Sequence, residues 1–395
     1  MTSNHQRIVV VGGGIVGISI ALGLVRQGAE VTVLESGSLG GATTSTSYAW
    51  VNSNGKEPEN YYAINRAGLE AHREFAAERS GPGAHGWFFP TGHLEIAADE
   101  SHERDVRRRA EALTARGYAA EELTPAQVRD LEPGLRLPES PRALFHFPEE
   151  AHLYPLLYLA EALVRLRCAG GTVVERATVV GFDARADGVT VRTEEGGSYA
   201  ADQVVLAAGR WTGELAALAG GEVPLATFRE PGDVTVGYLA RTNPVPAKID
   251  RLLTTPWLNA RPDGGGRLLI QALDLDATAD PGAAPELGGR LAGEYLSRLQ
   301  AVLADTSDAR IEEIMVGQRV MPADGKTIAS PVPAVPWLYA VATHSGVTLA
   351  PFLGTAVAGE VLGTAEPLLE DFRLSRFQHG VPVEPPRGPR KPGEQ

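Results

Sequence analysis

Three consecutive glycines near the start of the chain constrain its fold more than any other feature. They occupy positions 12–14 and interrupt Ile8–Val25, a run of 18 residues without charge. A run of that length could form a membrane-spanning helix, but the glycines divide it into a β-branched strand at 7–11 and an apolar helix at 15–27. A second strand is predicted at 30–34. The order strand, helix, strand is typical of a β-α-β unit that opens a parallel sheet.

The glycines also form a dinucleotide-binding fingerprint, G-x-G-x-x-G, between a predicted strand and a predicted helix. Gly12 permits the tight turn, Gly14 lets a pyrophosphate approach the backbone, and Gly17 lets the helix pack closely on the strand. The helix N-terminus offers unpaired N–H groups to the anion. Glu35 lies 23 residues after Gly12, where its carboxylate can accept both hydroxyls of an adenosine ribose. The negative charge of Glu35 would repel the 2′-phosphate of NADP, so NADP is disfavoured as the ligand. The alternative interpretation is a glycine-rich turn without a ligand.

Composition narrows the functional classes. The chain has 395 residues, 43% of them hydrophobic and 22% charged, which suits two to three globular units. The net charge is −13, so we expect no nucleic-acid partner. Cys168 is the sole cysteine, which excludes an internal disulfide and fits a reducing cytoplasm; no spacing of His or Cys indicates a metal site. We expect no membrane insertion, because prolines interrupt the second uncharged run, Thr327–Gly359.

Strand–helix alternation recurs at the start, middle and end of the chain. The segments between look like a separate sheet with helices. We therefore expect a Rossmann-like (α/β) nucleotide domain assembled from discontinuous segments, with an antiparallel-sheet (α+β) substrate domain inserted twice. The nucleotide domain takes residues 1–60, 148–225 and 310–376, the inserted domain takes 61–147 and 226–309, and a Pro-rich tail that we expect to be disordered takes 377–395.

Local patterns predict the individual elements. Helices are expected at 61–79, 101–116, 154–169, 288–303 and 349–362. Strands are expected at 172–180, 188–192, 203–206, 234–239, 267–273 and 335–341. Residues 87–97 predict a strand pair that turns near Pro90–Gly92, and 131–148 is Pro-rich and predicted to be irregular.

Several further segments resemble one known family. Residues 35–45, which contain Thr43-Thr44, look like a flavin-domain segment of the D-amino-acid oxidase, glycine oxidase and sarcosine oxidase family of FAD-dependent oxidoreductases. Residues 203–211 resemble the family's second flavin motif, and residues 319–325 and 344–351 resemble its C-terminal pair. The order and spacing of these segments cover nearly the whole chain.

The resemblance implies a set of FAD-binding residues. Thr43 and Thr44 would meet the pyrophosphate, Tyr48, Ala49 and Trp50 would run beside the flavin ring, and the backbone near Val174 would hold the adenine. The full set expected to bind the cofactor is Gly12, Gly14, Ile15, Val16, Gly17, Glu35, Ser36, Thr43, Thr44, Ala49, Trp50, Val174, Gly209, Trp211, Ser345, Gly346, Val347 and Thr348. We expect non-covalent FAD, because Cys168 lies outside the C-terminal motif and no histidine lies between Ser36 and Asn60.

The resemblance also implies the reaction. A small amine or amino acid would give hydride from its Cα to flavin N5, and reoxidation by O2 would yield hydrogen peroxide. The protein supplies binding and orientation, so we expect no protein base in the hydride step. Arg319 matches the family's substrate-carboxylate arginine, and a structural ion pair is the alternative. His344 would lie near the ring, with a loop histidine as the alternative.

Some residues depart from the family pattern. Val320 replaces a proline, Trp50 replaces a smaller residue, and Tyr154 replaces an acid. Tyr48 and Trp50 would narrow or reshape the substrate pocket, which puts glycine or simple D-amino acids in doubt as the substrate. Lys56 could assist O2 electrostatically or be a solvated lysine.

Three other functional classes stay open. One is a dehydrogenase of the same fold that passes electrons to a quinone or carrier. The second is a flavin monooxygenase, which the absence of a second dinucleotide fingerprint counts against. The third is a non-catalytic flavin-binding protein. A homo-oligomer is also compatible with the sequence.

Overall fold

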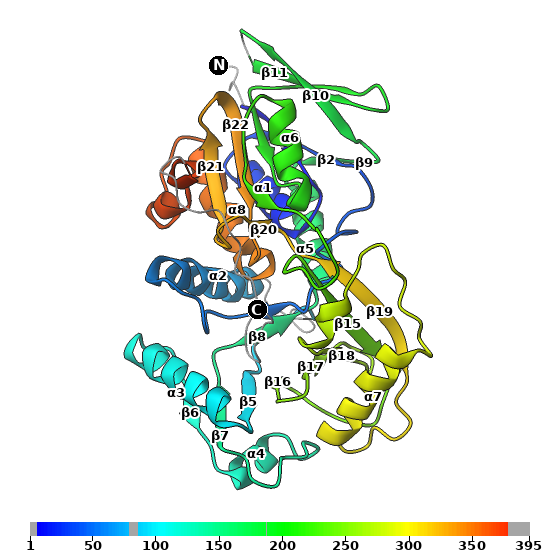
Figure 1. Ribbon diagram of the computed structural model, residues 1–395. Helices are drawn as coiled ribbons and strands as arrows, with labels where there is room; N and C mark the ends of the chain where they lie inside the picture. Colours follow the sequence, from blue (N-terminus) through cyan, green and yellow to red (C-terminus); the bar gives the residue numbers. More distant parts are fainter. Residues whose placement is uncertain (1–5, 79–85, 187, 378–395) are drawn as a thin grey trace.

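The computed structural model describes residues 6–78, 86–186 and 188–377. Its two largest sheets belong to two separate parts of the molecule. A six-stranded sheet with its helices forms the upper part of the molecule in Figure 1, and an eight-stranded sheet forms the lower part. The chain passes between the two parts several times, so each is built from segments that are far apart in sequence. No helix within the described ranges is long and apolar enough to cross a membrane.

The six-stranded sheet has the order β21-β22-β13-β1-β2-β9. All neighbours are parallel except β21 and β22. Its strands are β1 (Arg7–Val11), β2 (Glu30–Glu35), β9 (Thr172–Glu175), β13 (Gln203–Leu206), β21 (Ile328–Val332) and β22 (Val335–Ala342). The central strands β1 and β13 are apolar and buried after their first residue, as expected for a sheet that is covered on both faces, whereas the edge strand β9 is partly exposed.

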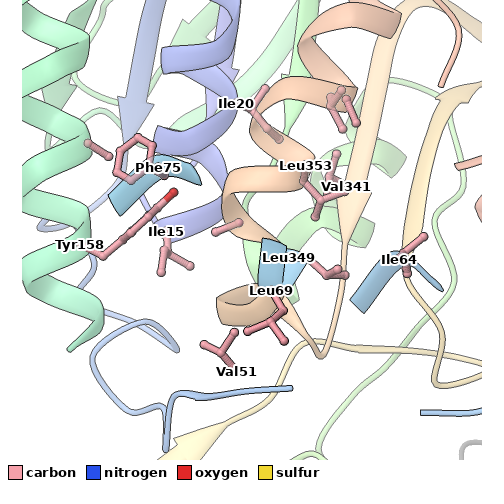
Figure 2. Packing of buried hydrophobic residues seen from close by; sticks show 14 of the residues in the cluster. Ile15, Ile20, Val51, Ile64, Leu69, Phe75, Tyr158, Val341, Leu349 and Leu353 are labelled. Atoms are coloured by element: carbon pink, nitrogen blue, oxygen red, sulfur yellow. The ribbon is translucent and has the colours of Figure 1, made fainter. Parts of the chain in front are cut away.

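Helices α1 (Ile15–Arg26) and α8 (Gly346–Val361) pack tightly together beside this sheet. A Cβ added to Gly23 would lie 2.0 Å from the carbonyl oxygen of Gly354, so only glycine permits this approach. Helices α2 (Glu59–Ala77) and α5 (Pro155–Cys168) pack around the pair. Figure 2 shows the resulting core, in which apolar side chains of the helices and of β22 meet. Packing in this core therefore holds the N-termini of α1 and α8 in position.

The eight-stranded sheet has the order β19-β15-β18-β17-β16-β5-β7-β6, and only the β16–β5 pair is parallel. Its strands are β5 (His93–Ala97), β6 (Glu121–Glu122), β7 (Ala143–Phe147), β15 (Val236–Thr242), β16 (Leu252–Thr254), β17 (Asn259–Pro262), β18 (Leu268–Gln271) and β19 (Ile311–Gln318). A second apolar core joins this sheet to helix α7 (Arg290–Val302). Helices α3 (Glu100–Ala115) and α4 (Pro125–Leu131) complete this part.

Smaller elements connect and flank the two parts. A three-stranded sheet contains β3 (Trp50–Val51), β8 (Ala151–Leu153) and β4 (Phe88–Phe89), and another contains β10 (Val179–Arg185), β11 (Gly188–Thr193) and β12 (Ser198–Ala201). Strands β14 (Leu225–Ala226) and β20 (Met321–Pro322) pair with each other. The remaining helices are α6 (Thr212–Leu218) and the 3₁₀ segments η1 (Gly209–Trp211), η2 (Leu275–Thr278), η3 (Pro367–Phe372) and η4 (Leu374–Phe377).

The expected fold, a Rossmann-like unit with an antiparallel sheet inserted, is confirmed, and three local predictions are corrected. Residues 87–97 are not a hairpin, because β4 pairs with β8 while β5 pairs with β7 and β16. The segment 131–148 contains a regular strand, β7. Strand β19 falls within 310–376 yet pairs with β15, so the sheets place the boundary after Gln318. Phe377 is part of η4, and residues 378–395 of the expected tail lie outside the described residues.

Candidate active site

A cavity of about 890 Å³ lies where the two large sheets approach each other. On one side it is lined by the carboxyl ends of β1, β2 and β22 and by the loop that follows β13. On the other side it is lined by residues of β15, β17 and β18, among them Gly237, Asn259 and Gln271. Ligand sites in open α/β sheets lie at such strand ends. The cavity is therefore the candidate active site.

The glycine-rich turn forms the tightest part of the cavity wall. Gly12 has a φ of +112°, and a Cβ there would lie 2.5 Å from the Ala207 carbonyl oxygen. A Cβ on Gly17 would lie 2.0 Å from the Gly12 carbonyl oxygen. Gly17 does not line the cavity and acts instead by close packing. Helix α1 follows the turn without a side-chain cap, so its N-terminal N–H groups and dipole favour an anion in the cavity.

Glu35 is held in place by the backbone on both sides of it. Its carboxylate accepts hydrogen bonds from the N–H of Gly13 at 2.7 Å and from that of Gly37 at 2.8 Å. Ser36 Oγ donates a further bond at 3.3 Å. A carboxylate has about four acceptor positions, so Glu35 keeps about one for a ribose hydroxyl, and a second becomes free if the long Ser36 bond is exchanged. Both Glu35 and Ser36 line the cavity.

The two threonines of the flavin segment have different partners. Thr44 Oγ1 accepts the N–H of Ile15 at 3.1 Å, at the start of α1. Thr43 Oγ1 donates to the carbonyl oxygen of Gln318 at 2.7 Å, which ties the segment to the end of β19. Both residues line the cavity. Thr44 is thus placed beside the anion position, whereas Thr43 also joins the two parts of the molecule.

A second helix begins at the cavity. Ser345 precedes α8 without a side-chain cap, and its hydroxyl is 2.7 Å from the Tyr61 hydroxyl. Thr348 Oγ1 donates to the Trp50 carbonyl oxygen at 3.3 Å. Residues Ser345, Gly346, Val347 and Thr348 all line the cavity. Two helix N-termini whose N-cap residues make no side-chain cap, a glycine cradle and the Glu35 carboxylate match the anionic and hydroxyl groups of FAD, so the residues present fit this cofactor.

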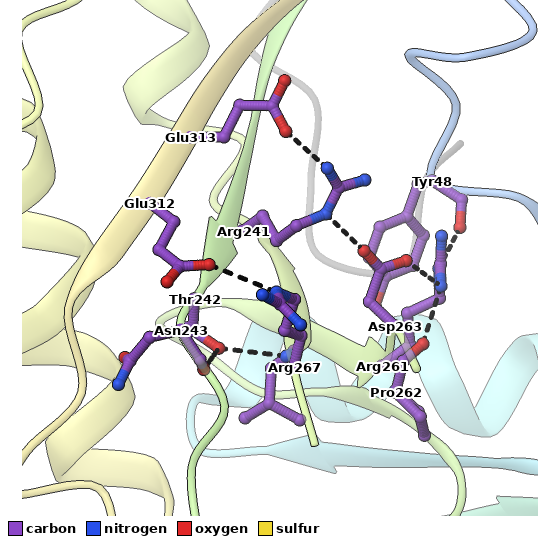
Figure 3. A network of polar contacts seen from close by, with 11 residues as sticks. Tyr48, Arg241, Thr242, Asn243, Arg261, Pro262, Asp263, Arg267, Glu312 and Glu313 are labelled. Carbon is purple, nitrogen blue, oxygen red and sulfur yellow. Dashed lines mark hydrogen bonds and ion pairs between the residues drawn. The ribbon is translucent and has the colours of Figure 1, made fainter. Parts of the chain in front are cut away.

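Tyr48, Ala49 and Trp50 form the wall between the two parts. Arg261 Nε donates to the Tyr48 carbonyl oxygen at 2.6 Å, and Figure 3 shows the buried pairs that hold Arg261 in place. Ala49 has a φ of +57°, a left-handed conformation that turns the chain toward β3. Trp50 Nε1 donates to Glu150 at 2.5 Å, so its indole is fixed in position. All three line the cavity.

Arg319 lines the cavity and is already partly engaged. Its Nη1 donates to the carbonyl oxygens of Val234, at 3.1 Å, and Val236. Its Nη2 forms an ion pair with Asp276 at 3.1 Å. Nε makes no hydrogen bond with the described residues. The structural ion pair that was the alternative interpretation is therefore present, while Nε–H and the second hydrogen of Nη2 remain for a ligand.

His344 and Lys56 lie together near the start of α8. Burial and, to a smaller extent, the positive charge of Lys56 lower the pKa of His344 to about 4. His344 is therefore neutral at pH 7 and lines the cavity. Lys56 is only 7% exposed, so the interpretation as a solvated lysine is wrong.

The residues that line the cavity differ in part from those expected to bind the cofactor. Val174 pairs with Leu34 inside the sheet and does not line the cavity; Ala177, Thr178 and Val179 do. Gly209 and Trp211 line it as expected. No local pattern indicates Asn259, Gln271 or Gln318, because their place in the cavity depends on strand register.

Comparisons with known proteins identify the family of this chain. The family model for FAD-dependent oxidoreductases called DAO matches residues 7–359. Glycine oxidase of Geobacillus kaustophilus is 25% identical over 391 residues, covering 97% of this chain and all of that one. One subunit of the opine oxidase of Agrobacterium tumefaciens is 26% identical over 380 residues, covering 93% of this chain and 96% of that one.

The solved structures show the same fold. The crystal structure of glycine oxidase from Geobacillus kaustophilus superposes with a TM-score of 0.81 at 23% identity, covering 94% of this chain and 99% of that chain. The crystal structure of L-proline dehydrogenase from P. horikoshii superposes with a TM-score of 0.79 at 21% identity, covering 95% of this chain and 98% of that chain. The chain therefore belongs to the DAO family of FAD-dependent oxidoreductases, and FAD is its cofactor.

Proposed function

We propose that this enzyme oxidises a small amino acid, with the substrate carboxylate bound by Arg319 and with O2 reoxidising the cofactor. Two relatives are named glycine oxidase and opine oxidase, and glycine carries both an amine and a carboxylate. When bound, FAD supplies a hydride acceptor for the carbon that bears the amine. The remaining steps depend on residues of this chain.

The observation that carries the proposal is the way Arg319 is held. The carbonyl oxygens of Val234 and Val236 and the carboxylate of Asp276 fix the guanidinium plane. This orientation leaves Nε–H and one N–H of Nη2 for a two-point bond to a carboxylate. Because the plane is fixed before the ligand arrives, little side-chain entropy is lost on binding. Arg319 would thereby orient the amine-bearing carbon.

His344 and Lys56 support two further roles. A neutral His344 adds no charge that would compete with Arg319 for the carboxylate, and it can accept a hydrogen bond from the substrate amine. Lys56 contributes a buried positive charge near the same end of the cavity. Such a charge would favour electron transfer to O2, because negative charge develops on the oxygen. No side chain is required to remove a proton from carbon.

Anaerobic mixing with candidate substrates tests this proposal. The FAD-loaded protein is mixed with D- and L-amino acids, N-methyl amino acids and cyclic imino acids, and the absorbance of oxidised flavin is followed. We expect bleaching by at least one carboxylate-bearing amine and peroxide formation when O2 is admitted. Bleaching followed by slow reoxidation in O2 but fast reoxidation by a quinone would replace the oxidase with a dehydrogenase. No bleaching across the panel would contradict the proposed function.

A further inference from the structure

Three polar side chains lie in one row across the eight-stranded sheet. Asn259 on β17 is directly opposite Gln271 on β18 and Thr254 on β16. Residues in direct register on neighbouring strands point to the same face of a sheet. Ile270 and Ala260, the next residues along, belong to the apolar core that packs against α7. The row therefore faces away from that core, and Asn259 and Gln271 line the active-site cavity.

The two amides in this row differ from the hydroxyl beside them. Thr254 Oγ1 is 2.9 Å from His93 Nε2, so its hydroxyl has a protein partner. Asn259 and Gln271 are 4% and 8% exposed, and neither side chain makes a hydrogen bond with the described residues. Their amide atoms open into the cavity, where water or a ligand must supply their partners. A ligand that displaces this water without replacing its hydrogen bonds would lose a factor of about ten to one hundred in its binding constant. A ligand in the cavity can supply the missing partners.

The charge around the row limits what that ligand can be. Arg319 is the sole Lys or Arg side chain lining the described cavity, and Asp276 balances its charge. Asn259 and Gln271 each offer one acceptor and two donor hydrogens. A carboxylate would satisfy the donors alone, and an apolar group would satisfy neither. A carboxamide or hydroxyl satisfies both donors and acceptors without charge.

We propose that Asn259 and Gln271 form a polar subsite that binds a neutral hydrogen-bonding group at the far end of the substrate. The substrate class is then a small amino acid with a carboxamide or hydroxyl in its side chain. This inference rests on the proposed amino-acid oxidation. A site whose buried polar groups need partners rejects an analogue that lacks them more strongly than an apolar pocket rejects an extra group.

Asparagine, aspartate and leucine test the subsite because their side chains have nearly the same shape. Both enantiomers of each are compared by kcat/KM with the FAD-loaded enzyme. We expect asparagine to exceed leucine by about tenfold to hundredfold, with aspartate between them. In Gln271→Met and Asn259→Leu the preference for asparagine over leucine should fall to within about threefold. The control Gln300→Met, on α7 outside the cavity, should keep the wild-type ratio.

A binding measurement separates failure of the subsite from failure of the reaction. Succinamate and 4-methylpentanoate have the carboxylate and the two side-chain shapes but no amine, so neither can be oxidised. Their affinities follow from the change that they cause in the flavin absorption spectrum. Tighter binding of succinamate, lost in Gln271→Met, supports the subsite even if no amino acid bleaches the flavin. Equal binding of the two acids, or leucine oxidised as well as asparagine, would overturn it.

Discussion

At the glycine-rich end of the cavity the backbone supplies the contacts, whereas at the end lined by the eight-stranded sheet the side chains do. The turn at 12–17 excludes any Cβ from two positions, and its carboxylate partner, Glu35, is itself held by backbone N–H groups. At the other end Asn259 and Gln271 come from the neighbouring strands β17 and β18, whereas Arg319 follows the end of β19, far along the chain. Substitutions that add side-chain volume should therefore be most damaging at the glycine-rich end. Substitutions that remove polar groups should be most damaging at the end lined by the eight-stranded sheet.

Adding one methyl group at the backbone end should have the largest effect. In Gly17→Ala the new Cβ would lie 2.0 Å from the Gly12 carbonyl oxygen, so α1 must move away from β1. We expect the purified variant to lose its bound FAD, measured from the flavin-to-protein absorbance ratio. Gly293→Ala is the control, because nothing lies within 4 Å of a Cβ there and the residue is in helix α7. That change should stabilise the protein by about 0.5–1 kcal/mol. Full FAD content in Gly17→Ala would contradict the close packing.

Removing a buried charge at the side-chain end should have the second-largest effect, a loss of protein stability. Arg261 is 2% exposed, donates to the Tyr48 carbonyl oxygen and pairs with Asp263 at 2.9 Å. Arg261→Met leaves the Tyr48 and Pro262 carbonyl oxygens without this donor, while Asp263 keeps its pair with Arg241, and should cost about 1–3 kcal/mol of stability. Arg267→Met removes an exposed pair with Glu312 and should cost about 0–1 kcal/mol. Thermal melting checks both, and equal midpoints would refute a structural role for Arg261.

Glu35→Ala should weaken FAD binding without preventing it. Each hydrogen bond to a charged acceptor contributes about 1.5–3 kcal/mol, so the dissociation constant of FAD should rise by at least tenfold. Glu175→Ala is the matched control, because Glu175 accepts from Leu39 N–H in the same region but does not line the cavity. Titration of the apoprotein with FAD measures both variants. If Glu35→Ala and Glu175→Ala bind FAD with equal affinity, Glu35 does not bind the ribose.

Acid should destabilise the core beside α8 to a smaller extent. Burial lowers the pKa of His72 from its usual value near 6.5 to about 4, although the bond to the Val347 carbonyl oxygen opposes this. The unfolded chain therefore takes up this proton at higher pH than the folded protein, and stability falls as pH drops from about 6.5 to 4. His72→Gln keeps a donor for Val347 but does not titrate. Its melting temperature should fall less across this range than that of the wild type; an equal fall would contradict the assignment.

The same contrast explains what the sequence could reveal. Gly12, Gly17 and Glu35 lie in one short stretch of sequence, so they follow from a local pattern, although the neighbour of Gly12, Ala207, does not. Val174 does not line the cavity because the chain first leaves the sheet, turns at Arg176 with a φ of +56°, and only then reaches the cavity at Ala177. A local pattern does not contain that turn.

At the side-chain end the decisive information is strand register. Asn259 and Gln271 carry no motif, and they meet only because β17 pairs with β18 in that alignment. Strand β19 escaped prediction because Glu312 and Glu313 on its exposed part break the apolar pattern. The partner of Arg319, Asp276, lies 43 residues earlier, on a short 3₁₀ segment. Sequence therefore located the arginine but not the contacts that orient it.

The rate of flavin reduction in Arg319 variants tests the central claim most directly. Losing one partner of a buried charge pair costs about 2–5 kcal/mol, so Arg319→Ala should lower kcat/KM by about thirtyfold to several thousandfold. Arg319→Lys should recover part of this, because a point charge replaces the fork. The decarboxylated analogue should be a poor substrate of the wild type and lose little more in Arg319→Ala. If Arg319→Ala reduces its flavin with the carboxylate substrate at the wild-type rate, the amino-acid assignment is contradicted.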